Sequence, residues 1–194
     1  VNLKEIVESL IDTFLDAGQV ALDLRKKGLT KTIKSDNTPV SNGDLEVNKI
    51  ITNKIRDLTP DISIVSEETS ENKKNEELSD FWLIDPIDGT YDYINDLDEF
   101  TINAGLILDK KPAAGLIYVP AKKRMFYSYG EDLAFELTNG KTLKLEGSKN
   151  FNKEEIKFVS YSNKIKPEIE QIHKKFNVKH FTRMKSSLKF CVIA

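Results

Sequence analysis

Cysteine and histidine are scarce in this chain of 194 residues, which has one cysteine, Cys191, and two histidines. A single cysteine excludes any disulfide within the chain and fits a reducing compartment, so we expect a cytoplasmic protein. Association with the cytoplasmic side of an inner membrane stays an open alternative. The two histidines, His173 and His180, lie among lysines in a polar stretch and are expected on the surface.

Long apolar runs and a strong charge of one sign are also absent. The longest apolar runs are far too short to span a bilayer, and the acidic start of the chain is unlike a secretory signal. The chain lacks an initiating Met, so we expect its native start to be missing or processed. A formal net charge of −2 provides no global basic field, so we expect no nucleic-acid partner; a homodimer stays open.

The stretch around which the chain is organised is residues 81–90, where a short apolar run ends in two carboxylates. Phe81–Ile84 is typical of a buried strand, and Pro86 then removes a backbone donor, so we expect the strand to stop there. Asp85 and Asp88 would project into one small volume, where burial makes two like charges costly. A divalent cation relieves that cost, and carboxylates are ligands that Mg²⁺ prefers.

Further polar residues strengthen this interpretation. Gly89 allows a tight turn or a close approach to a ligand, and Thr90 offers a hydroxyl where a helix could begin. A second acidic pair, Glu67 and Glu68, follows the strand predicted at residues 62–65. A lone Asp-Pro-x-Asp-Gly sequence is more typical of a turn, but two strands that both end in carboxylates favour one shared cation site.

Periodicity predicts the remaining elements. Apolar residues at helical spacing indicate a helix over residues 3–27, closed by Gly28, and a second helix from Ser41 to residue 58. Residues 29–40 are expected to form a loop. An antiparallel meander of strands should continue the sheet over residues 100–108, 113–119, 124–129, 133–137 and 142–145.

A polar stretch at residues 146–155 marks the predicted boundary between two units. Residues 1–148 form the first unit, and residues 149–194 begin a second with a β-α-β-α pattern, which is typical of a three-layer unit. The chain stops at Ala194 within an apolar helical run. We therefore expect the second unit to be incomplete in this chain and the native chain to continue.

These motifs resemble those of a known enzyme family. Ser-Glu-Glu-Thr at residues 66–69, followed by Trp-Leu-Ile-Asp-Pro-Ile-Asp-Gly-Thr at residues 82–90, resembles the signature of the lithium-sensitive, Mg²⁺-dependent phosphatases of the inositol monophosphatase superfamily. Three further stretches resemble those of its CysQ-type 3'(2'),5'-bisphosphate nucleotidases. They are Thr-Pro-Val-Ser with Asp44, Glu-Phe-Thr-Ile-Asn at residues 99–103 and Ser-Ser-Leu-Lys-Phe-Cys at residues 186–191. The resemblance implies an α/β fold of alternating α-β-α-β-α layers.

The resemblance also implies a metal-binding role for each acidic motif. Glu67, Asp85 and the backbone carbonyl of Ile87 would hold a first Mg²⁺, and Asp85 would bridge to a second one held by Asp88. Glu68 would support these ligands or contribute to a weak third site. The complete site would thus take two Mg²⁺ ions and leave a third open.

Asp44 and Thr90 are the catalytic pair that the resemblance implies, and they would orient and deprotonate the attacking water. For Asp44 the alternative is a helix-capping box with Ser41. For Ser186 and Ser187 the alternative to substrate binding is a plain helix N-cap. The implied substrate-binding set is Glu67, Ile87, Asp88, Gly89, Thr90, Ser162, Ser186 and Lys189.

Several positions, besides Asn42 and Gly43, depart from the residues usual in this family. Asn163 replaces a histidine, Lys185 replaces a glycine, and Tyr91-Asp92-Tyr93 replaces a Lys-Glu-Phe stretch, which removes a cation beside the site. These changes bear on which phosphorylated molecule is chosen, since the second unit would contact the nucleotide.

The resemblance implies hydrolysis of adenosine 3',5'-bisphosphate to AMP and phosphate. An inositol or sugar phosphate phosphatase of the same fold is one alternative, and a catalytically inactive binding homologue is another. The family has a further Asp, which completes the second metal site, and residues 1–194 hold no counterpart. We therefore expect this chain by itself to bind one Mg²⁺ or Mn²⁺ and to hydrolyse phosphate esters slowly or not at all.

Overall fold

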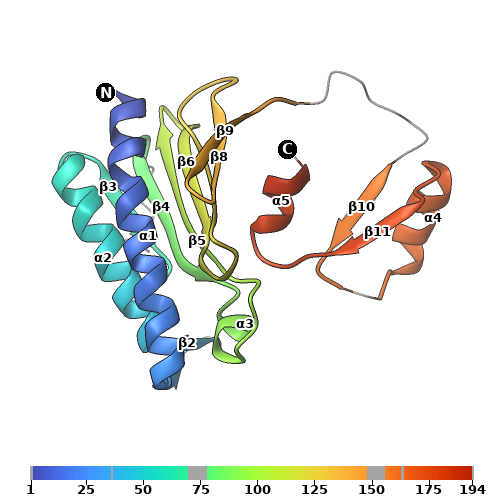
Figure 1. Ribbon diagram of the computed structural model, residues 1–194, viewed down its shortest axis with the longest axis horizontal. Coiled ribbons are helices and arrows are strands. Elements are labelled where there is room, and N and C mark those ends of the chain that lie inside the picture. The colour runs from blue at the N-terminus through green and yellow to red at the C-terminus, as the bar shows by residue number, and fades with distance from the viewer. Residues whose placement is uncertain (1, 36, 70–77, 148–155, 163, 194) are drawn as a thin grey trace.

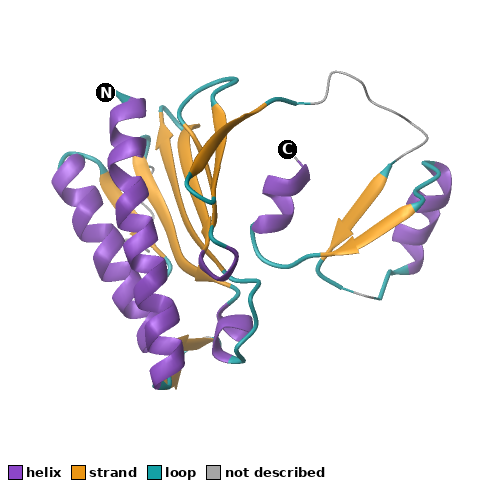
Figure 2. Cartoon of the chain, in the orientation of Figure 1, coloured by secondary structure: helices purple, strands orange, loops and turns teal. Residues whose placement is uncertain are grey.

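The computed structural model describes residues 2–35, 37–69, 78–147, 156–162 and 164–193. Across Figure 1 the elements form layers: two long helices, a seven-stranded sheet, a short helix, a two-stranded sheet and an outer helix. Figure 2 shows the same alternation of helix and strand. This is the α-β-α-β-α order that the resemblance implied. Among the described residues, no helix is long and apolar enough to cross a membrane.

The first layer consists of α1 (Leu3–Lys27) and α2 (Asn42–Leu58), which confirms both predicted helices. The side chain of Asn2 caps α1 by accepting a hydrogen bond from the amide of Glu5, and Gly28 ends the helix with φ 96°. Each helix buries one apolar face against the sheet, as its periodicity requires. Their fully buried apolar residues are Val7, Leu10, Phe14, Ala17, Ala21, Val47, Ile51 and Ile55.

Residues 29–40 contain a short hairpin, so the expectation of a plain loop was wrong. In it, β1 (Lys31–Ile33) pairs antiparallel with β2 (Pro39–Ser41). Three-residue strands are too short to show an alternating pattern in the sequence. The hairpin leads directly into Ser41, the N-cap of α2, and so fixes where that helix begins.

The central sheet has the strand order β3-β4-β5-β6-β7-β8-β9, and only β3 and β4 are parallel. The predicted antiparallel meander is therefore confirmed. Paired residues with positive φ, Asp109-Lys110 and Asn139-Gly140, form its two tightest turns. The strands are β3 (Ser63–Ser66), β4 (Phe81–Asp88), β5 (Thr101–Leu108), β6 (Lys111–Val119), β7 (Arg124–Ser128), β8 (Ala134–Thr138) and β9 (Lys141–Leu145).

Strand β4 continues through Pro86, whereas we expected it to stop there. Asp85 pairs with Asn103 and Asp88 with Thr101, so two β4 residues oppose one β5 residue between these pairs. Such a bulge is one of the few places where a sheet tolerates proline. Residues three apart on a regular strand face opposite sides of the sheet. The extra residue of the bulge offsets this alternation, so Asp85 and Asp88 face the same side of the sheet.

The smaller unit pairs β10 (Lys157–Ser160) with β11 (His180–Arg183) in parallel, joined through α4 (Pro167–Lys175). The chain then returns to α5 (Leu188–Ile193), which lies over the face of the central sheet opposite α1 and α2 (Figure 1). The predicted β-α-β-α pattern is confirmed. The predicted boundary between residues 148 and 149 falls within residues 148–155, outside the described residues.

The two histidines differ in their surroundings. His180 is exposed, as expected. His173 is partly buried, contrary to the prediction, because its ring packs edge-on against Phe158 with a centroid distance of 4.1 Å.

Candidate active site

Three carboxylates, those of Glu67, Asp85 and Asp88, come together where β3 and β4 end. Ser66 is paired with Ile84 in the parallel ladder, so the residues that follow emerge at the same level. The amide of Glu67 donates to the carbonyl of Ile84 at 3.1 Å, which holds the end of β3 against β4. Burial, and then the charges of Glu67 and Asp88, raise the pKa of Asp85 to about 8. The structure thus places the three groups close enough to repel one another.

Several buried oxygens in this region have no hydrogen-bond partner among the described residues, and two of them belong to a carboxylate and an amide. They are Oδ1 of Asp85 and Oδ1 of Asn103, which lies across the ladder from Asp85. A buried acceptor without a partner costs roughly 1–3 kcal/mol, and more when it is charged. An all-oxygen donor set with an unmet need for positive charge fits a hard divalent cation such as Mg²⁺. The sequence analysis did not single out Asn103, although it lies in the Glu-Phe-Thr-Ile-Asn motif.

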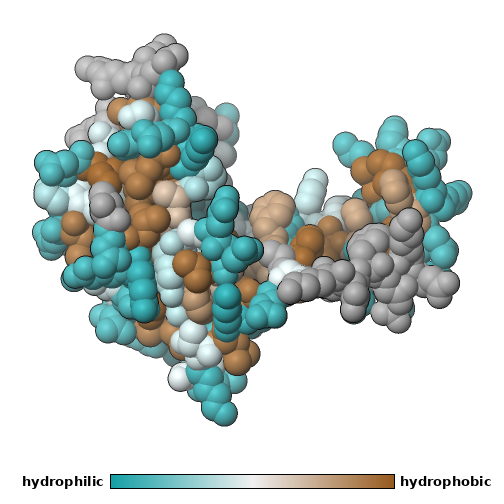
Figure 3. All heavy atoms as spheres, turned by 90° about the horizontal axis from the view of Figure 1, so that it is seen from above, coloured by the Kyte–Doolittle hydropathy of each residue, from teal (hydrophilic) through white to brown (hydrophobic). Residues whose placement is uncertain are grey.

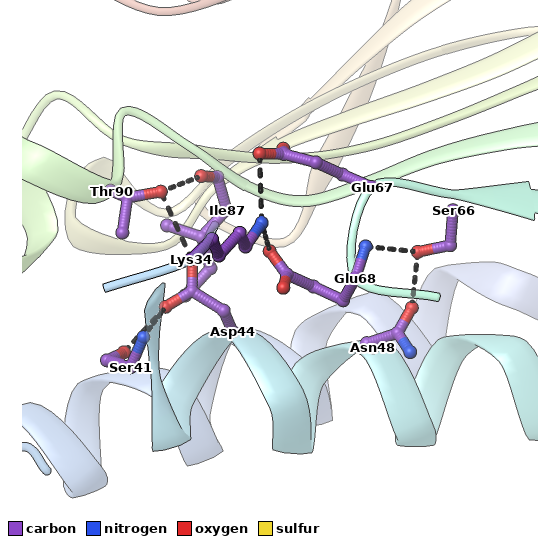
Figure 4. Close-up of polar contacts among 9 residues, drawn as sticks. All are labelled: Lys34, Ser41, Asp44, Asn48, Ser66, Glu67, Glu68, Ile87 and Thr90. Carbon is purple, nitrogen blue, oxygen red and sulfur yellow. Dashed lines mark hydrogen bonds and ion pairs between the residues drawn. The ribbon is translucent and has the colours of Figure 1, made fainter. Parts of the chain in front are cut away.

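As the side chains stand, no three Asp, Glu, His or Cys residues of the described ranges are arranged to hold a metal ion. Two of the acidic side chains instead contact the hairpin residue Lys34, whose Nζ lies 3.3 Å from Oε1 of Glu67 and 2.8 Å from Oε1 of Glu68 (Figure 4). Burial lowers the pKa of Lys34, but hydrogen bonds and charges from Glu68 and Glu67 outweigh this effect and raise the pKa above its usual value. Lys34 therefore neutralises charge that a cation would otherwise meet. Sequence reasoning missed this contact because it depends on the unexpected hairpin.

Asp44 uses its two carboxylate oxygens for different partners. Oδ2 accepts from the amide of Ser41 at 2.9 Å and from its hydroxyl at 2.6 Å, which confirms the capping box. Oδ1 lies 3.2 Å from Oγ1 of Thr90, and that hydroxyl is also 3.1 Å from the carbonyl oxygen of Ile87 (Figure 4). Burial raises the pKa of Asp44, against the lowering effect of these hydrogen bonds. Helix capping and a contact with Thr90 are therefore compatible rather than exclusive.

The turn after β4 brings Thr90 back towards Asp44. Gly89 has φ 94° and ψ 39°, and α3 (Thr90–Ile94) starts directly after it. A Cβ atom at Gly89 would lie 3.2 Å from the carbonyl oxygen of Glu99. Both the left-handed backbone and this close approach favour glycine at the position.

A buried contact between Asn48 and Ser66 fixes the acidic turn to α2. The hydroxyl of Ser66 donates to Oδ1 of Asn48 at 2.6 Å and accepts from the amide of Glu68 at 3.4 Å (Figure 4). Sequence reasoning did not single out Asn48. Its spacing could have indicated the role, because Asn48 follows Asp44 by one helical turn and so shares its face.

The predicted residues of the smaller unit are placed unevenly. Ser187, which was not in the predicted substrate-binding set, contacts a carboxylate: its hydroxyl donates to Oδ2 of Asp88 at 2.8 Å. The hydroxyl of Ser186 is buried without a partner among the described residues. Lys189 donates from Nζ to the carbonyl of Ser186 at 2.7 Å. Ser162 bonds within its own loop, donating to the carbonyl of Lys164, and no described contact joins it to the carboxylates.

A cleft of about 570 Å³ opens beside Asp85, between the central sheet and α5. Its walls are mostly apolar, as is typical of sites that receive a small molecule. Polar groups enter it at the carboxylate end, from Asp85, Asn103 and Ser187. The arrangement can therefore hold a cation at one end and an organic group along the sheet.

Comparisons with known proteins agree with this geometry. The chain is 33% identical over 142 residues to the 3'(2'),5'-bisphosphate nucleotidase CysQ of Aggregatibacter actinomycetemcomitans, a match that covers 72% of this chain and 53% of that protein. It is 32% identical over 164 residues to CysQ of Escherichia coli, covering 83% and 64%. The crystal structure of CysQ from Bacteroides thetaiotaomicron shares the fold, with a TM-score of 0.70 at 22% identity, covering 96% of this chain and 75% of that one.

The matches to the two curated relatives thus span between half and two thirds of their length. The family comparison covers more of this chain. The sequence model described as the inositol monophosphatase family matches residues 2–194, and the solved relative has the same layered fold. On this evidence the chain belongs to the inositol monophosphatase family.

Proposed function

We propose that this protein is a Mg²⁺-dependent phosphatase that converts adenosine 3',5'-bisphosphate to AMP and phosphate. The observation that carries the proposal is Asp85, buried against Glu67 and Asp88 with one oxygen unpartnered among the described residues. Buried carboxylates of this kind stay ionised at neutral pH only when a cation compensates them. The names of the CysQ relatives support the choice of substrate.

In a complete site, the predicted ligand set would take two Mg²⁺ ions. Glu67, Asp85 and the carbonyl of Ile87 would hold one ion, Asp85 and Asp88 would hold the other, and Glu68 would serve a weak third site. Bound Mg²⁺ would polarise the attacking water and offset negative charge on the phosphate oxygens. The oxygen chemistry of this set matches that ion, although Glu67 must first leave Lys34.

Thr90 and Asp44 would take the proton of the attacking water. The hydroxyl of Thr90 can donate to Oδ1 of Asp44, 3.2 Å away, while its lone pair accepts a hydrogen bond from the water. Because burial raises the pKa of Asp44, this carboxylate is a stronger base than an exposed one. The two bonds from Ser41 hold the other oxygen, so Oδ1 stays directed at Thr90.

Substrate binding would combine both units. The backbone N–H groups of Gly89 and Thr90 would hold the phosphate, while Ser162, Ser186 and Lys189 would contact the nucleotide. The buried hydroxyl of Ser186, unpartnered among the described residues, supports a ligand at that point. The apolar cleft beside Asp85 offers room for the nucleoside.

Phosphate release from a panel of substrates, by a protein that carries every metal ligand, tests this function. The panel contains adenosine 3',5'-bisphosphate, an inositol phosphate and a sugar phosphate, each with Mg²⁺ and with EDTA. We expect the nucleotide to be preferred and EDTA to abolish release. Preference for the inositol or sugar phosphate would favour the related phosphatase. Binding of the nucleotide without release, in a protein that carries every metal ligand, would favour an inactive homologue.

A further inference from the structure

Residues 184–188, here called the strap, run from the end of β11 to the start of α5 and connect the smaller unit to the central sheet (Figure 1). Its two ends are fixed in different units. The amide of Met184 donates to the carbonyl of Ser160 at 2.9 Å, within the smaller unit. Leu188 is fully buried with Val119 and Phe126 against the central sheet. The strap therefore crosses the edge of the cleft next to the carboxylates.

Lys185 provides two polar attachments of the strap to the carboxylate-bearing unit, in addition to the bond from Ser187 to Asp88. Its amide donates to Oε2 of Glu99 at 3.0 Å, and its Nζ donates to Oδ1 of Asp92 in α3. The side chains of Lys185 and Asp92 are 21% and 6% exposed, so this ion pair is largely withdrawn from water. Nζ also lies 6.0 Å from the ring centroid of Tyr91. Glu99 is itself held by Lys122 at 3.1 Å.

The residues between these attachments have a constrained geometry. Ser186 has φ 50°, a left-handed conformation that residues other than glycine adopt only when their surroundings hold them there. Its hydroxyl is buried and unpartnered within the described part of the chain, and the next residue, Ser187, donates to Asp88 at 2.8 Å. Lys185 on one side and Leu188 on the other hold this turn in place, together with Lys189, which donates to the carbonyl of Ser186.

We propose that Lys185 is a positioning residue for the nucleotide: its ion pair with Asp92 and its bond to Glu99 hold Ser186 and Ser187 at the carboxylate end of the cleft. This inference rests on the proposed function. A preformed strap binds the nucleotide without an ordering step, so its loss weakens binding of the nucleoside part. Inorganic phosphate lacks the nucleoside part, so its binding depends less on the strap than binding of AMP does.

Calorimetric titrations of the Mg²⁺-loaded protein with AMP and with inorganic phosphate test the proposal. Lys185→Met should weaken AMP binding about tenfold and phosphate binding by a much smaller factor. Asp92→Asn, which removes the other partner, should do the same. Lys185→Arg should retain AMP binding within about twofold, because it keeps the charge. Lys179→Met, at an exposed lysine of the same unit, is the matched control and should bind both ligands as wild type does.

Hydrogen exchange of residues 184–189 supplies a readout independent of ligand. It should be faster in Lys185→Met than in the Lys179→Met control. Unchanged AMP binding in Lys185→Met, or equal weakening of AMP and phosphate, would overturn the positioning role. A wild-type protein that binds phosphate but no AMP would instead overturn the proposed nucleotide function, and the inference with it.

Discussion

At the scale of single residues, the protonation of Asp85 links cation binding to folding stability. Burial and the neighbouring carboxylates raise the pKa of Asp85 from its ordinary 3.8 to about 8 in the metal-free protein. The folded state therefore binds this proton more tightly than the unfolded state does. The stabilisation that this proton provides is complete below the pKa of Asp85 in the unfolded chain. It is lost as pH rises through the pKa of Asp85 in the folded protein.

We therefore expect Mg²⁺ to raise Tm more at about pH 8 than at about pH 5, since the cation replaces the lost proton. Thermal unfolding with Mg²⁺ and with EDTA at both pH values measures this difference. Asp85→Asn, which does not titrate, should reduce it strongly. An equal rise in Tm at both pH values would show that Asp85 is not compensated by the ion.

Asp44 allows its two functions to be separated by mutation. Asp44→Asn keeps the size of the side chain and an acceptor for Ser41, but it removes the base, so kcat should fall by about a hundredfold or more while the protein stays folded. Ser41→Ala should instead destabilise the fold by about 1 kcal/mol through the lost cap. Steady-state kinetics and urea unfolding of both variants measure the two effects. Near wild-type kcat in Asp44→Asn would exclude it as the base.

At the scale of elements, the turn between β4 and α3 depends on Gly89. Gly89→Ala should destabilise the protein by more than about 1–2 kcal/mol, because the new Cβ adds a contact with the carbonyl of Glu99 to the backbone strain. Gly28→Ala is a matched control, since Gly28 has φ 96° but open space around its Cβ position. Urea unfolding compares them. An equal loss in both variants would mean that the close approach at Gly89 has no energetic consequence.

The elements that could be predicted from the sequence are those whose pattern is local. Periodicity located α1 and α2, and turn residues located the meander, because amphipathic spacing and positive φ are encoded within a few residues. The bulge at Pro86 could not be predicted, since it exists only in the pairing of β4 with β5. For the same reason the sequence indicated the carboxylates but not their partners Lys34 and Ser187, which come from distant segments. It also did not indicate Asn48, which holds Ser66 beside them.

At the scale of the whole molecule, a larger and a smaller body are joined through a narrower middle region (Figure 3). The larger body carries the carboxylates, and the smaller one carries Ser162. The strap and α5 lie between them, and the cleft beside Asp85 includes residues of both segments. Under the proposed function, one end would handle phosphate and the other would select the organic group.

Titration of the metal-free protein with Mn²⁺ tests most directly whether Glu67, Asp85 and Asp88 form a cation site. Mn²⁺ takes the same oxygen ligands as Mg²⁺, and its binding can be followed by calorimetry. We expect saturable binding with release of protons below about pH 8, lost in Asp85→Asn and retained in Asp61→Asn, a control at an exposed position. Equal binding by the wild type and Asp85→Asn would contradict a cation site at these carboxylates.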